Sequence, residues 1–236
     1  MRKEAYATIR KNTPLKIKAT RLWTHVFADT ALVSLIASLV ISFNGSFVQY
    51  LAIPLIATFM FRSFSLMHES VHGVTYKNKF VNDFFGVLYG SLNLLPYEQW
   101  KKTHLEHHFW SGNIEKDPVM TIVRQFPAMN SKTKRFLNTL WVLWIPMLAF
   151  LQYGVFWYAS LGHYFKGQKS LRNVISLFSP IFVWTTILAL APLQISLTVL
   201  APAVVLYMIA VEVINFPHHL GLPQSKGDAK LPAWEQ

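Results

Sequence analysis

Four long apolar stretches constrain the fold of this chain more than any other feature of its sequence. They cover residues 23–43, 47–67, 174–191 and 193–214. Each is close to the roughly 20 residues that an α-helix needs to cross the hydrocarbon core of a bilayer. Of the 236 residues, 53% are hydrophobic and only 14% are charged, a balance that is unusual for a soluble globule. We therefore predict an all-α integral membrane protein with four transmembrane helices in two hairpins.

Two further stretches are aromatic but less uniformly apolar. Residues 80–96 contain asparagine, aspartate and two glycines, and residues 136–160 contain Pro146. Polar groups and proline in such segments favour helices that lie in the membrane interface or bend. Arg62, near the end of the second apolar stretch, is expected to extend toward the interface. Because no repeat or linker divides the chain, residues 1–236 are predicted to form a single membrane domain.

The distribution of basic residues predicts the orientation of the protein. The turns around Asn44 and Pro192 contain no lysine or arginine, whereas residues 1–22, the polar middle of the chain and the linker 166–172 contain many. The positive-inside rule therefore predicts cytoplasmic termini, with residues 1–22 as a basic cytoplasmic arm. The net charge of +11 fits anionic lipid headgroups as neighbours. Nucleic acid is not an expected partner, because the basic residues alternate with apolar stretches.

Seven of the nine histidines fall into three clusters near the predicted cytoplasmic ends of the helices. The first cluster is a pair four residues apart, which places both imidazoles on one face of a helix. The second combines an i, i+3 pair with an adjacent histidine that points in another direction, so that one segment can serve two metals. The third follows the last apolar stretch. In chain order the clusters contain His68 and His72; His104, His107 and His108; and His218 and His219.

Isolated histidines at a membrane boundary are often simple polar anchors, but three converging clusters are costly to place there without a function. The chain contains no cysteine, so any metal must be bound by histidine, carboxylate or amide groups. Neutral imidazoles suit iron, zinc or copper, and the number of histidines favours two metals. The sequence therefore predicts a cytoplasmic, histidine-rich metal site without selecting the metal.

The motifs HESVHG, WKKTHLEHHFWSGNIEKDP and EVINFPHHLGLP resemble those of the membrane fatty acid desaturase and hydroxylase superfamily. The resemblance implies a non-haem centre of two irons that uses molecular oxygen and two electrons to abstract hydrogen from an unactivated acyl methylene. It also implies iron ligands at His68, His72, His104, His107, His108, His218 and His219, with Asn215 as a direct or water-bridged ligand. Carboxylates that orient these imidazoles are then expected at Glu69, Glu106 and Glu212.

One part of the pattern is missing. Members of this superfamily usually carry a final H-x-x-H-H motif, whereas residues 220–236 contain no histidine. We therefore expect a C-terminally incomplete chain whose iron site lacks part of its ligands.

Three function classes follow from these motifs. The leading prediction is a fatty acid desaturase that acts on lipid acyl chains and takes electrons from a separate carrier, such as ferredoxin or a small haem protein. Alternatives on the same scaffold are a hydroxylase or ketolase of an alkane, sterol or carotenoid. The remaining class is a metal-binding membrane protein or an inactive remnant.

Two smaller features lie within the second of these motifs. Trp100, Lys101 and Lys102 are expected either to anchor the chain at the interface or to form a surface for an acidic electron carrier. Asp117, followed by Pro118, is expected to end a helix and to shape the turn after the second histidine motif, without a catalytic role.

Overall fold

The computed structural model describes residues 21–215 and 226–227, and this part of the chain is entirely helical. Most of the predicted basic arm, up to residue 20, lies outside the described residues, and a single domain over the whole chain stays a prediction. The longer elements are α2 (Arg21–Ser42), α3 (Ala52–Val71), α4 (Lys79–Leu92), α5 (Tyr97–Trp110), α7 (Ser131–Val142), α8 (Met147–Phe165), α9 (Leu171–Leu190) and α11 (Ala201–Asn215). Short helices connect them: η1 (Phe47–Leu51), η2 (Pro118–Met120), α6 (Thr121–Gln125), η3 (Phe126–Ala128), α10 (Leu193–Ile195) and the π-helical η4 (Ser196–Leu200).

Four helical segments are long and apolar enough to cross a membrane. They are Arg21–Ser42, Phe47–Val71, Leu171–Leu190 and Leu193–Ile214. Their bounds agree with the four predicted stretches, so the prediction of four candidate crossings is confirmed at the level of helix length and composition. Insertion in a bilayer and the cytoplasmic orientation stay predictions.

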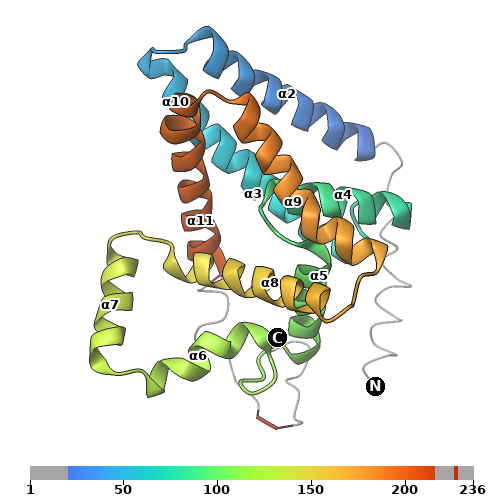
Figure 1. Cartoon of the computed structure of the whole chain (residues 1–236), viewed down its shortest axis with the longest axis vertical. Helices are drawn as coiled ribbons and strands as arrows, with labels where there is room; N and C mark the ends of the chain where they lie inside the picture. Colours follow the sequence, from blue (N-terminus) through green and yellow to red (C-terminus); the bar gives the residue numbers. More distant parts are fainter. Residues whose placement is uncertain (1–20, 216–225, 228–236) are drawn as a thin grey trace, which may run out of the picture.

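Helix α3 lies at the centre of the bundle (Figure 1). It packs against α4 on one side and α11 on another, while α9 packs against α4. The chain reverses direction between α9 and α10, as the second predicted hairpin requires. Helices α9 and α11 then diverge, because α9 packs against α4 and α11 packs against α3 (Figure 1). Helix α8 crosses the bundle and contacts α5, α9 and α11.

The stretch predicted to be interfacial or bent is bent. Helices α7 and α8 meet at an angle of 107°. Trp144 adopts a left-handed backbone conformation with φ of 57°, which ends α7, and Pro146 precedes the first turn of α8. Proline cannot donate a hydrogen bond inside a continuous helix, so the break at this position follows from the local sequence.

None of the residues of helix α2 is buried, and the helix contacts the bundle through the partly buried Ile36, Leu39 and Val40 and through polar side chains. The Arg62 guanidinium lies 3.1 Å from the Asp29 carboxylate of α2, and the Tyr89 hydroxyl of α4 donates to the same carboxylate at 3.0 Å. At the start of α2, Arg21 pairs with Glu69 at 2.8 Å. Asp29 thus supplies a partner for Arg62 on a neighbouring helix, and the position of Arg62 near the membrane interface stays a prediction.

Helix α5 is positioned by close packing at its first residue. Tyr97 is fully buried and lies directly against Gly86 and Gly90 of α4. A Cβ atom at Gly86 would collide with the Tyr97 ring. These two glycines allow α5 to start against the core and to extend past the end of α3.

Candidate metal centre

The first and second histidine clusters converge at the end of α3. His68 lies in the last turn of α3, His72 caps that helix, and His104 and His108 lie one turn apart on α5. One ring nitrogen from each of the four lies within 4.8 Å of the others. His104 is central, because its Nε2 lies 2.9 Å from Nε2 of His72 and 3.0 Å from Nε2 of His108.

This arrangement fits a metal ion. Four imidazoles that bind one metal at about 2.1 Å in a tetrahedral arrangement place their nitrogens roughly 3.4 Å apart. The distances in the cluster, from 2.9 Å up to 4.8 Å, bracket that separation. Since metals bind the neutral form of histidine, the protonation state of the rings also matters.

The surroundings of the cluster favour neutral imidazoles. Burial, with repulsion from His68, His108 and the other rings, lowers the pKa of His104 from 6.5 to about 2. Burial also lowers the pKa of His72 and of His108. Protons therefore compete little with a metal at this site near neutral pH.

These pKa shifts predict how the metal-free protein responds to acid. Between pH 6.5 and about pH 2, the unfolded chain protonates His104 while the folded chain does not. The unfolded state thus binds more protons, so stability should fall as the pH drops below 6.5. We expect the thermal unfolding midpoint of the metal-free protein to be lower at about pH 5.5 than at about pH 8, with a smaller difference in His104→Gln. A midpoint independent of pH in wild type would contradict this expectation.

His107 lies beside the cluster and is oriented by a carboxylate. Its Nδ1 lies 2.9 Å from both carboxylate oxygens of Asp117, whose side chain is completely buried. A carboxylate only accepts hydrogen bonds, so His107 carries a proton on Nδ1 and would bind a metal through Nε2. The expectation that Asp117 ends a helix was wrong, because α5 ends at Trp110. Asp117 instead starts η2 by accepting from Val119 N, and it also holds His107.

The loop that carries Asp117 is fixed by Asn113 and by a contact with a distant part of the chain. The buried Asn113 side chain accepts from the backbone N–H groups of Glu115 and Lys116. It also donates to the carbonyl of Gly227 at 3.0 Å, and the Gly227 N–H donates to the Glu115 carboxylate at 2.8 Å. We call this two-sided contact of Asn113 and Glu115 with Gly227 the Gly227 clasp. The clasp braces the loop that positions Asp117.

Trp100 packs against two rings of the histidine cluster. Its ring stacks on His104 with 4.6 Å between centroids and 8° between planes, and it makes a T-shaped contact with the His68 ring. With only 6% of its surface exposed, Trp100 is a core residue, so the expectation of a surface role for it was wrong. Lys101 is paired with Asp83 at 2.9 Å, whereas Lys102 is exposed.

The structure places the predicted carboxylates in three different settings. Glu69 pairs with Arg21, Glu106 is exposed, and Glu212 accepts from the backbone N–H of Ala149 at 3.0 Å. Asn215 is the last residue of α11, and its side chain is not described. His218 and His219 lie outside the described residues. The roles assigned to all of these residues stay predictions.

We expect Asp117→Asn to weaken metal binding by about 10- to 100-fold, the usual effect of removing an outer partner of a metal-bound histidine. The asparagine keeps the size of the side chain but loses the charge that favours a proton on Nδ1 of His107. The measurement is an iron titration of the purified protein. Asp83→Asn, which removes a partly buried carboxylate paired with lysine, is the control. Equal iron affinity in wild type and Asp117→Asn would refute the orienting role.

A helical bundle with four potential membrane-crossing helices and an imidazole cluster at a helix end has the features expected of a membrane protein with a histidine-rich metal site. Comparison with known proteins identifies the family. Residues 45–235 match the fatty acid desaturase family, and the chain belongs to that family. The resemblance seen in the histidine motifs is thereby confirmed.

Individual relatives agree with this assignment. The chain is 35% identical over 99 residues to a fatty acid desaturase of Bacillus subtilis, covering 40% of this chain and 28% of the relative. It is 35% identical over 97 residues to an endoplasmic reticulum omega-3 fatty acid desaturase of Vigna radiata, covering 41% and 26%. It is 28% identical over 201 residues to a chloroplastic, ferredoxin-type sn-2 acyl-lipid omega-3 desaturase of Helianthus annuus, covering 78% and 43%.

These matches cover less than half the length of each of these curated relatives. No solved structure matches the chain significantly.

Proposed function

We propose that this chain carries out oxygen-dependent desaturation of a fatty acyl chain at a non-haem centre of two irons. The observation that carries the proposal is the convergence of His68, His72, His104 and His108 from α3 and α5 in a chain of the desaturase family. The long apolar helices would place this centre beside a bilayer that contains the substrate. The metal site and the termini are proposed to face the cytoplasm, as the basic residues predict.

The residues of the chain have distinct tasks in this proposal. The four converging histidines, with His107, His218 and His219, would hold the iron, and Asn215 would add a direct or water-bridged ligand. Bound iron would supply the oxygen chemistry that removes hydrogen from an acyl methylene. Asp117 keeps the proton of His107 on Nδ1, and Trp100 keeps the His104 ring in place by stacking. Glu69, Glu106 and Glu212 stay candidates for further orienting groups.

The electrons are proposed to come from a separate carrier. The name of the Helianthus annuus relative specifies ferredoxin, which makes a small acidic iron–sulfur protein or a small haem protein a reasonable donor. Lys102 is exposed on α5, two residues before His104, where it can meet an acidic surface. Lys101 contributes less, because Asp83 already neutralises it.

The proposal is tested by iron analysis and product analysis of the detergent-purified protein. We expect close to two irons per polypeptide and, with a reduced carrier, oxygen and a phospholipid, a new double bond in the acyl chain. An inserted oxygen would instead identify a hydroxylase on the same scaffold. Iron without oxygen consumption would indicate a metal-binding membrane protein, and a folded chain that takes up no iron would refute the metal centre altogether.

A further inference from the structure

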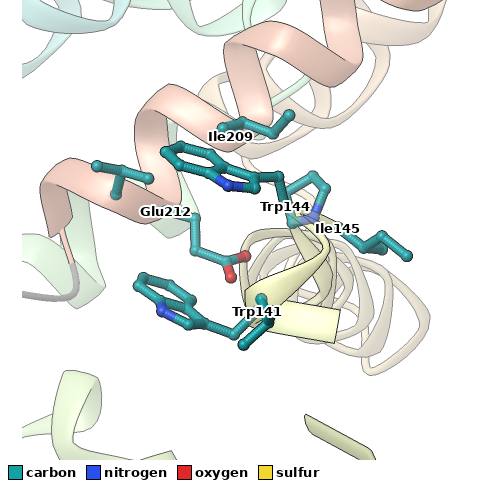
Figure 2. Close-up of a pocket in the computed structure, with 8 residues that line it drawn as sticks. Trp141, Trp144, Ile145, Ile209 and Glu212 are labelled. Carbon is teal, nitrogen blue, oxygen red and sulfur yellow. The ribbon is translucent and has the colours of Figure 1, made fainter. Parts of the chain in front are cut away.

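A cavity of about 270 Å³ lies where α7 bends into α8 against the end of α11. Its walls are almost entirely apolar. Two tryptophans lie on either side of one carboxylate, and Figure 2 shows the Glu212 carboxylate between the rings of Trp141 and Trp144. The lining residues are Trp141, Val142, Trp144, Ile145, Pro146, Ile209, Glu212 and Val213.

Glu212 is the acidic group of this cavity, and it is 7% exposed. Its Oε2 accepts the backbone N–H of Ala149 in the first turn of α8, an interaction that favours the ionised form. The apolar walls oppose ionisation, because they replace water around the charge. A cation bound in the cavity would offset this cost.

The chemistry of the walls selects the kind of cation. A metal ion or a primary ammonium group needs several oxygen acceptors, which the apolar lining does not offer. A quaternary ammonium group has no N–H groups to satisfy, loses little by leaving water, and is attracted by indole faces and by a carboxylate. An anionic headgroup would be repelled by Glu212.

The position of the cavity points to a lipid as the carrier of this group. Ile209 and Val213 lie in the last turns of the candidate crossing Leu193–Ile214, so the cavity is level with the end of a crossing. Exposed tryptophans at this level are typical of the membrane interface, where lipid headgroups lie. We propose that the cavity binds the quaternary ammonium headgroup of a choline lipid, with Glu212 as the counter-ion and Trp141 and Trp144 as aromatic walls. This inference goes beyond the proposed desaturation and does not depend on it.

The proposal is tested by binding, with neither iron nor turnover required. The protein in a maltoside detergent is titrated with dihexanoylphosphatidylcholine and with dihexanoylphosphatidylglycerol, and binding is followed by calorimetry. We expect the choline lipid to bind about tenfold more tightly than the glycerol lipid. A parallel titration with choline chloride distinguishes a lipid ligand from free choline. Weaker binding of free choline than of the choline lipid supports a lipid ligand. Equal or tighter binding of free choline overturns the assignment of the ligand as a lipid.

Variants locate the binding in the cavity. Glu212→Gln keeps an acceptor for Ala149 but removes the charge, so it should lower affinity for the choline lipid about tenfold without lowering affinity for the anionic glycerol lipid. Trp144→Leu should weaken choline binding as well, while Trp23→Phe on α2 should not. Thermal unfolding checks that each variant is folded. Equal affinity for the two lipids, or choline-lipid binding unchanged in both Glu212→Gln and Trp144→Leu, would overturn the proposal.

Discussion

Replacing His104 by alanine should cause the largest loss of metal binding of any single substitution in the cluster. His104 is the ring whose Nε2 contacts Nε2 of both His72 and His108. Outer partners of a metal-bound histidine typically contribute about 10- to 100-fold to affinity. Removing a direct ligand should therefore lower iron affinity by more than about 100-fold, with a comparable loss of double-bond formation. Iron titration and product analysis measure the two effects separately.

His163→Ala is the matched control, because His163 lies in the last turn of α8 outside the cluster. It should leave iron affinity and product formation unchanged. Trp100→Leu should have an intermediate effect, since it removes only the stacking partner of His104. If His104→Ala retained wild-type iron content, the cluster of four histidines would not be the metal site.

Of the substitutions proposed for this chain, Arg62→Met should lower the free energy of unfolding the most. Asp29 would then lose its ionic partner between α2 and α3 while keeping the Tyr89 hydroxyl as a donor. Leaving one charge of a fully buried pair without its partner typically costs about 3–5 kcal/mol, whereas the Arg62 and Asp29 side chains keep 26% and 17% of their surface exposed. The free energy of unfolding in detergent should therefore fall by about 2–3 kcal/mol. The double variant Arg62→Met with Asp29→Leu should recover much of the loss, because no unpaired charge remains.

The pair of the exposed Arg172 with the partly buried Asp83 provides the comparison. Arg172 is 67% exposed and lies 3.6 Å from the Asp83 carboxylate. Arg172→Met should therefore change stability by less than about 1 kcal/mol. If Arg62→Met were equally mild, or if the double variant were less stable than Arg62→Met, the ion pair would not be what attaches α2.

The helices could be predicted from the sequence because their signal is local. Apolar length alone defines α2, α3, α9 and the segment that ends in α11. The bend between α7 and α8 could be anticipated for the same reason, since Pro146 acts on its own neighbours. The spacing within the first two histidine clusters likewise depends only on helical geometry.

The partners of those helices could not be predicted, because the sequence does not show which faces meet. Asp117 lies ten residues after His107, outside any helical spacing, so only the fold of the intervening loop brings the two together. The pairing of Arg62 with Asp29 could not be predicted either, because Asp29 lies on another helix. Trp100 is buried through the approach of α5 to α3. A carboxylate in the loop after a histidine motif is the one sequence signal that could have indicated Asp117.

The Gly227 clasp has a consequence for the order of folding. Its two hydrogen bonds join residues that are 114 and 112 positions apart. On a ribosome, α3 and α5 emerge and can pack together long before Gly227 has been made. The loop that aims Asp117 at His107 is therefore braced only near the end of synthesis. His107 is thus expected to be the last of the described histidines near the cluster to reach its final orientation, so metal loading during synthesis would start from His68, His72, His104 and His108.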